Sequence, residues 1–182
     1  MLSITVITLT RRRVKLLQRA IKSVQVQNYD GPVKQLILID DCQETRHFLE
    51  NEYISSGQLE WRLMPRNSKD RTGPWRTSKL RNTAVELADT DCVSFLDDDN
   101  EYEPNHLSTL VNCMTHTKSP AVHSHEKIFW PDGRPYLEQR IPWCRDPEEA
   151  KQQYTELRRK GIFKPGTNIS HDRADPKGHP DP

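Results

Sequence analysis

The sequence has no excess of charge of either sign and no long hydrophobic run. Its 27 lysines and arginines balance 26 aspartates and glutamates, which leaves a formal net charge of +1 at pH 7. Such a chain has no overall field to attract nucleic acid or an acidic membrane surface, so its partners must be recognised by local patches. No apolar run approaches the roughly 20 residues of a membrane-spanning helix. We therefore expect neither a nucleic-acid partner nor a transmembrane segment.

Cysteine is scarce and dispersed. The chain has four cysteines, and no two of them form a C-x-x-C pair: Cys42, Cys92, Cys113 and Cys144. A disulfide framework or a zinc site would show grouped cysteines, so this dispersion predicts reduced thiols in a cytoplasmic protein. The first ten residues lack the positively charged start of a signal peptide and predict a strand instead.

Apolar, β-branched runs alternate with helical patterns through the first half of the chain. Residues 3–9 and 35–39 have the composition of central strands covered on both faces, and residues 59–63 alternate as a strand nearer a sheet edge would. Residues 11–27 and 45–54 predict helices. This order predicts an α/β fold with a doubly wound, mostly parallel sheet that carries helices on both faces.

The most informative stretch is Cys92–Asn100. An apolar run of the length of a buried strand leads there into three consecutive carboxylates, Asp97, Asp98 and Asp99. Adjacent carboxylates repel one another, so a chain keeps them at a strand end mainly when a cation or hydrogen-bond donors lie opposite. One interpretation is a site for Mg²⁺ or Mn²⁺, which binds one or two carboxylates and completes its shell with water and phosphate oxygens. The other is that Asp97–Asn100 cap a following helix with Pro104 in its first turn.

Polar residues occur at the carboxyl ends of three predicted strands, including the strand that leads into the three acids. Ligands of open α/β sheets bind outside the carboxyl ends of the strands. The candidate residues at these ends are Thr8, Asp40, Asp41, Asp97, Asp98 and Asp99. Their convergence places hydrogen-bond acceptors where a base and a ribose would bind, and a metal-binding carboxylate where a diphosphate would follow.

A basic stretch lies between residues 65 and 82. It contains a single acid, Asp70, and six cations: Arg66, Lys69, Arg71, Arg76, Lys79 and Arg81. Mobile cations that lead into a helix could bind phosphate, and a solvated surface loop is the alternative.

The second half of the chain gives weaker signals. Residues 121–125 predict a strand with His123 and His125 on one face, where solvent-facing positions are favoured over a metal pair. Residues 129–136 predict a hairpin, and residues 148–160 predict a charged helix. Three aromatic residues could stack on a sugar or simply pack: Trp130, Tyr136 and Trp143.

Four blocks together resemble family-2-type glycosyltransferases of the GT-A fold. They are Ser-Ile-Thr-Val-Ile-Thr near the start, Leu-Ile-Leu-Ile-Asp-Asp in the second strand, Leu-Arg-Asn-Thr-Ala at 80–84 and Phe-Leu-Asp-Asp-Asp-Asn at 95–100. The resemblance covers roughly residues 3–125 and implies a UDP-sugar donor, a bound Mn²⁺ or Mg²⁺, and transfer with inversion to a glycan, lipid or protein acceptor.

The resemblance also implies roles for individual residues. Thr8 and Asp40 or Asp41 would lie around the uracil and ribose, and Arg81 would support the nucleotide or diphosphate. Asp97 would approach the ribose, Asp98 would belong to the same nucleotide-sugar site, and Asp99 would ligate the metal.

The resemblance and the composition together divide the chain into three parts. Residues 1–126 would form the donor-binding core, residues 127–163 a partial acceptor-side region, and residues 164–182 a flexible tail. The Glu-Asp block that carries the catalytic base of inverting members has no counterpart, and only Asp172 and Asp175 are candidates for a base. An incomplete acceptor side would expose apolar surface, which suggests a dimer or a partner subunit.

Two alternatives remain at the level of the sequence. The chain could be a nucleotide-sugar-binding module, or a truncated transferase, that has no turnover of its own. It could also be a nucleotidyltransferase, although the segment Leu9–Arg13 has no glycine and so lacks the phosphate loop of that class.

Overall fold

The computed structural model describes residues 1–53, 57–68, 70, 73–124, 129, 144 and 146–161. The chain divides into two compact units, Met1–Val122 and His123–Pro182.

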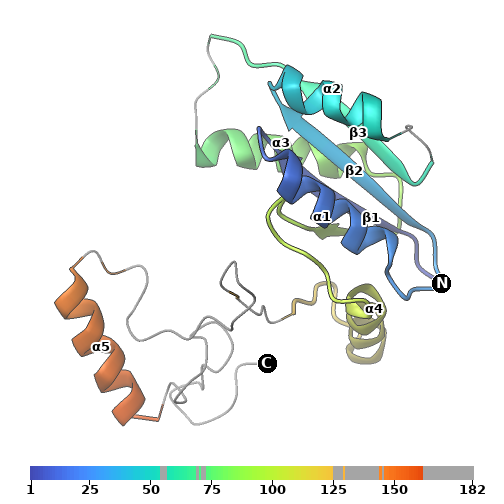
Figure 1. The fold of residues 1–182 in the computed structure, drawn as a ribbon. Helices are drawn as coiled ribbons and strands as arrows, with labels where there is room; N and C mark the ends of the chain where they lie inside the picture. The colour runs from blue at the N-terminus through green and yellow to red at the C-terminus, as the bar shows by residue number, and fades with distance from the viewer. Residues whose placement is uncertain are drawn as a thin grey trace. The chain divides into compact units, whose positions relative to one another are not determined.

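The first unit is built on a parallel sheet of four strands in its described part. The strands are β1 (Ile4–Thr10), β2 (Val33–Asp40), β3 (Leu59–Met64) and β4 (Cys92–Phe95), in the spatial order β3-β2-β1-β4 (Figure 1). All three pairings are parallel. The sequence-based prediction of a parallel α/β sheet is therefore confirmed, including the edge position of residues 59–63.

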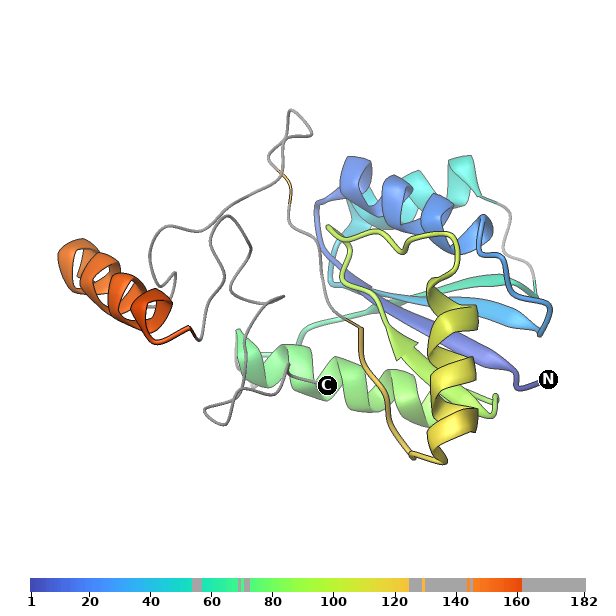
Figure 2. The same ribbon diagram turned by 90° about the horizontal axis from the view of Figure 1, so that it is seen from below.

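Helices cover both faces of this sheet. They are α1 (Val14–Gln25), α2 (Gln43–Glu52), α3 (Pro74–Leu87) and α4 (His106–Thr117). Figure 2 shows α3 on one side of the sheet and α1 on the other.

The alternation of side chains along β2 decides which helix each residue meets. Ile37 and Ile39 pack with Leu17 of α1, whereas Leu36 and Leu38 pack with Leu80 of α3. Because both faces of β2 are covered, the strand is apolar nearly throughout, as a central parallel strand should be.

The prediction that the strand before the three acids is buried is wrong. Val93 and Phe95 of β4 are exposed, while Cys92 and Ser94 are half-buried. β4 is one of the two edge strands of the described sheet, and α3 contacts β1 and β2. The face of β4 that carries Val93 and Phe95 therefore lies beyond the cover that α3 gives to the central strands.

The second unit contains α5 (Pro147–Arg159), which confirms the predicted charged helix. Asp146 caps it, because its carboxylate accepts a hydrogen bond of 2.8 Å from the backbone N–H of Glu149.

The predicted strand at 121–125 is wrong for residues 121–124, which pair with no described strand. In the described part of the chain, no helix is long and apolar enough to cross a membrane.

Candidate nucleotide and metal site

The three consecutive acids lie in the loop that joins β4 to α4. The Asn100 N–H donates to the Asp97 carbonyl at 3.1 Å, so the chain turns within the acidic stretch. α4 begins only at His106, with Asn105 at its N-cap position. The interpretation of these acids as a helix cap is therefore wrong, because the helix starts too far along the chain for them to reach its first turn.

The three carboxylates differ in exposure. The Asp97 and Asp99 side chains are 57% and 45% exposed, whereas the Asp98 side chain is only 7% exposed. Burial raises the pKa of Asp98, although interactions with Thr10 and Arg13 act in the opposite direction. Asp98 thus anchors the loop to the fold while its two neighbours face solvent.

Arg13 is a site residue that the sequence analysis missed. Its Nη1 donates to Asp98 Oδ1 at 3.1 Å and to Asp99 Oδ2 at 2.7 Å. The two negative charges raise the pKa of the Arg13 guanidinium. The sequence did contain one indication of this role. Arg13 lies between β1 and α1, which places it at the same edge of the sheet as the acids.

Arg81 and Asp97, two of the predicted site residues, meet in the structure. Arg81 Nη2 lies 2.9 Å from Asp97 Oδ1, and the guanidinium lies 5.8 Å from the centre of the Phe95 ring. α3 therefore brings a cation to the exposed side of the acidic loop, and both side chains remain accessible.

Asp40 ends β2 and is held by two arginines. Arg76 Nε donates to Asp40 Oδ1 at 2.9 Å, and Arg66 bonds both carboxylate oxygens. Burial alone would raise the pKa of Asp40, but these hydrogen bonds outweigh it and the pKa is lowered. A role for Asp40 at the nucleotide stays a prediction, and it would require a ligand to share the carboxylate with these arginines. Asp41, the next residue, is exposed and has a positive φ of 48°.

Thr8 lies inside β1, which continues for two residues to Thr10. Its side chain is fully buried, and its hydroxyl accepts a hydrogen bond of 3.1 Å from Gln35 Nε2. Its predicted contact with the nucleotide remains untested.

The basic stretch is largely neutralised by its own neighbours. Asp70 accepts from Arg76 at 3.2 Å and from Lys79 at 2.9 Å, and Asp40 pairs with Arg66 and Arg76. Lys69 and Arg71 lie outside the described residues. In the described part, this arrangement favours a structural ion-pair network over a set of mobile phosphate-binding cations.

The exposed acids have the chemistry that a hard divalent cation requires. Asp97 and Asp99 offer exposed carboxylate oxygens, the ligands that Mg²⁺ and Mn²⁺ prefer, although Arg13 Nη1 already lies 2.7 Å from Asp99 Oδ2. No group of three or more potential metal ligands occurs among the described residues. The two exposed carboxylates match the one or two protein ligands that Mg²⁺ takes when a diphosphate and water supply the others.

Several predicted residues lie outside the described part of the chain. They are His125, Trp130, Tyr136, Trp143, Asp172 and Asp175. His123, by contrast, is described, and its side chain is exposed.

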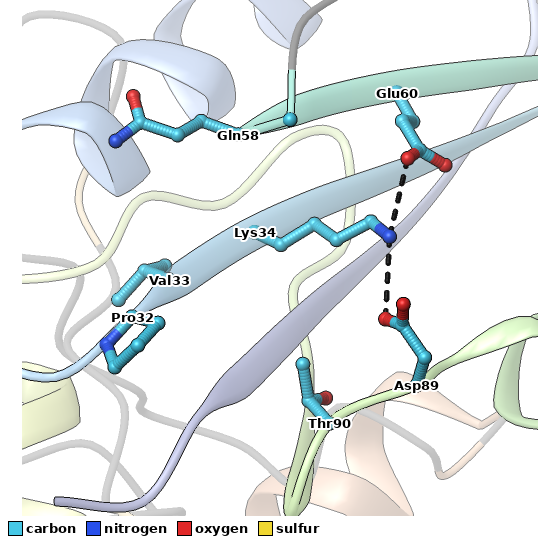
Figure 3. Close-up of a pocket in the computed structure, with 8 residues that line it drawn as sticks. Pro32, Val33, Lys34, Gln58, Glu60, Asp89 and Thr90 are labelled. Carbon is cyan, nitrogen blue, oxygen red and sulfur yellow. Dashed lines mark hydrogen bonds and ion pairs between the residues drawn. The ribbon is translucent and has the colours of Figure 1, made fainter.

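A cavity of about 430 Å³ lies at the opposite end of the sheet from the acids. It includes the start of β2, and Lys34 reaches Glu60 at 3.1 Å and Asp89 at 3.2 Å across it (Figure 3). Lys34 pairs with both acids, so each of these two carboxylates already has a cationic partner inside the protein.

Comparisons with known proteins indicate the family to which the chain belongs. The chain matches the model of glycosyl transferase family 2 over residues 5–173. It is 30% identical over 128 residues to Protein CgeD of Bacillus subtilis, covering 69% of this chain and 29% of that protein. It is 31% identical over 110 residues to the GalNAc(5)-diNAcBac-PP-undecaprenol beta-1,3-glucosyltransferase of Campylobacter jejuni. That match covers 59% of this chain and 33% of the other protein. The chain thus spans about a third of the length of these relatives.

A solved structure shows the same fold. The crystal structure of S. aureus TarS matches with a TM-score of 0.50 at 15% sequence identity, covering 92% of this chain and 32% of that one. Because the family model matches most of the sequence, the chain belongs to glycosyl transferase family 2.

Proposed function

We propose that this chain binds a UDP-sugar together with Mn²⁺ or Mg²⁺ and forms the donor side of an inverting glycosyl transfer to a glycan, lipid or protein acceptor. The observation that carries the proposal is the pair of exposed carboxylates, Asp97 and Asp99, on either side of the buried Asp98. The family supports the reaction class, and one relative is named as a glucosyltransferase.

Each residue of the acidic loop has a separate task in this proposal. Asp99 would hold the metal, and Asp97 with Arg81 would bind the ribose and the nucleotide. Asp98 holds the loop in place through its buried side chain, which also accepts a hydrogen bond from Arg13. When bound, the metal would neutralise the charge that develops on the departing diphosphate.

The test is a calorimetric titration of UDP into the protein with Mn²⁺ and then with EDTA. We expect UDP binding that depends on Mn²⁺, and at least about a tenfold loss of affinity in Asp99→Asn, because a metal ligand would be removed. Glu101→Gln is the matched control, since it removes one charge from the same loop at a residue that pairs with Arg19.

The outcome that contradicts the proposal is equally clear. UDP binding that is unchanged by EDTA, or equal losses in the two variants, would show that Asp99 holds no metal for the nucleotide. Release of UDP from UDP-glucose, measured with and without candidate acceptors, then separates a transferase from a binding module without turnover.

A further inference from the structure

We propose that Arg13 is an internal counter-ion that competes with the divalent metal for Asp99, so that the metal binds well only when a nucleotide diphosphate arrives with it. This inference rests on the proposed function of the same site. It adds a residue, Arg13, that controls the order and coupling of binding.

The geometry places one arginine nitrogen on both carboxylates. Arg13 Nη1 bridges Asp98 Oδ1 and Asp99 Oδ2 at 3.1 and 2.7 Å. The Asp98 side chain is buried and fixed, whereas the Arg13 side chain is 51% exposed. A small rotation of the Arg13 side chain can therefore lengthen its contact with Asp99 while the guanidinium stays beside the buried Asp98.

Charge explains why this contact opposes the metal. A guanidinium stays protonated at any working pH, so the contact with Asp99 cannot be relieved by deprotonation. A dication on the same carboxylate would lie close to this positive charge and would be repelled by it. Metal binding must therefore displace Arg13 from Asp99 or accept that repulsion, and either lowers the affinity for the metal alone.

A diphosphate removes this cost. Its oxygens offer Arg13 a new anionic partner and also supply ligands to the metal. The guanidinium would then bind the diphosphate instead of Asp99, which would leave that carboxylate free to hold the metal. Metal and nucleotide should consequently strengthen each other's binding by the same factor.

The test compares Mn²⁺ affinity, measured from the electron paramagnetic resonance signal of free Mn²⁺, in the wild type, Arg13→Gln and Arg12→Gln. Arg12 is an exposed neighbour whose side chain pairs with neither carboxylate, so its variant removes the same charge from the same loop. Without UDP, we expect Arg13→Gln to bind Mn²⁺ at least about fivefold more tightly than Arg12→Gln. Adding Asp99→Asn to Arg13→Gln should abolish that gain.

The coupling gives a second readout that a purely structural role would not move. UDP should tighten Mn²⁺ binding in the wild type by a larger factor than in Arg13→Gln, because only the wild type has to displace a guanidinium. Equal Mn²⁺ affinities in the two glutamine variants, weaker binding in Arg13→Gln, or an unchanged coupling factor would overturn the inference. Arg13→Lys serves if the glutamine variant does not fold, and it should show a smaller gain in the same direction, since lysine lacks the planar fork of arginine.

Failure of the proposed function would look different. In that case UDP would not bind to the wild type even with Mn²⁺, regardless of the order of Mn²⁺ affinities among the variants. If UDP binds with Mn²⁺ but the Arg13 and Arg12 variants behave alike, the donor site stands and only the role of Arg13 is wrong.

Discussion

At the scale of single residues, Arg76 shows how the end of β2 is fixed to α3. Its side chain is 4% exposed, and it bonds Asp40 at 2.9 Å, Asp70 at 3.2 Å and the Met64 carbonyl at 2.7 Å. All three groups lie at the carboxyl edge of the sheet or just after it. The arginine thus shares its charge between two carboxylates that the fold has largely removed from water, and Arg66 and Lys79 supply the remaining positive charge.

Replacing Arg76 with alanine should therefore be costly. Arg76→Ala leaves Asp70 with Lys79 and Asp40 with Arg66 only, and breaking a buried ion pair from one side costs about 3 kcal/mol or more. We expect a loss of this size in the free energy of unfolding, measured by urea denaturation.

Arg46→Ala is the matched control for this experiment. Arg46 bonds Glu50 at 2.7 Å one helical turn away on the exposed side of α2, and such pairs contribute about 0.5 kcal/mol or less. A loss in Arg76→Ala no larger than that in Arg46→Ala would show that the network around Asp40 does not stabilise the fold.

The acids of the site could be predicted from the sequence, but their partners could not. Asp97, Asp98 and Asp99 are visible because an apolar run leads directly into them. Their separation into two exposed carboxylates and one buried carboxylate depends on how the loop turns back, and the pairing with Arg13 depends on a contact across 85 residues of sequence. Periodicity along the chain carries no information on either.

At the scale of elements, the turn into β2 is shaped by the lack of a side chain at Gly31. A methyl group there would lie 2.5 Å from Tyr29 Cε1 and 2.7 Å from the Leu2 carbonyl oxygen. The Tyr29 hydroxyl donates to that same carbonyl at 2.5 Å, so a shift of either neighbour would disturb this hydrogen bond. The close approach of this turn to the start of β1 therefore depends on glycine.

Gly31→Ala should destabilise the protein by about 1 to 3 kcal/mol, because the added methyl overpacks a rigid contact. The measurement is the midpoint of thermal or urea unfolding. Gly57→Ala, just before β3, is the control, since a methyl group there meets nothing within 4 Å. Similar shifts in the two variants would mean that the chain relaxes around residue 31.

The order of strands and helices was predictable because each element carries its own periodicity. The boundaries moved by a few residues, as with β1, which continues to Thr10. The exposure of β4 was not predictable, because the same apolar run, Cys92–Leu96, is compatible with a strand that is covered on one face or on both faces. Cover depends on where α3 lies, and that is a property of the assembled sheet.

At the scale of the whole molecule, the two units differ in how much apolar surface their described elements bury. Three hydrophobic clusters link β1 and β2 with the helices of the first unit. In the described part of the second unit, one small cluster forms around Ala150 and Tyr154 of α5. Local stability follows such burial, so we expect the units to open independently and at different free energies.

Hydrogen exchange of the intact chain tests this expectation with two helices of similar length. α1 has 12 residues and α5 has 13, but α1 buries Leu17, Ala20, Ile21 and Val24 against the sheet. The backbone hydrogen bonds of the two helices are of the same kind, so a difference in protection must come from packing. We expect amides of α5 to exchange at least about 100-fold faster than those of α1. Equal protection would show that α5 opens only together with the sheet, and that the two units form one cooperative structure.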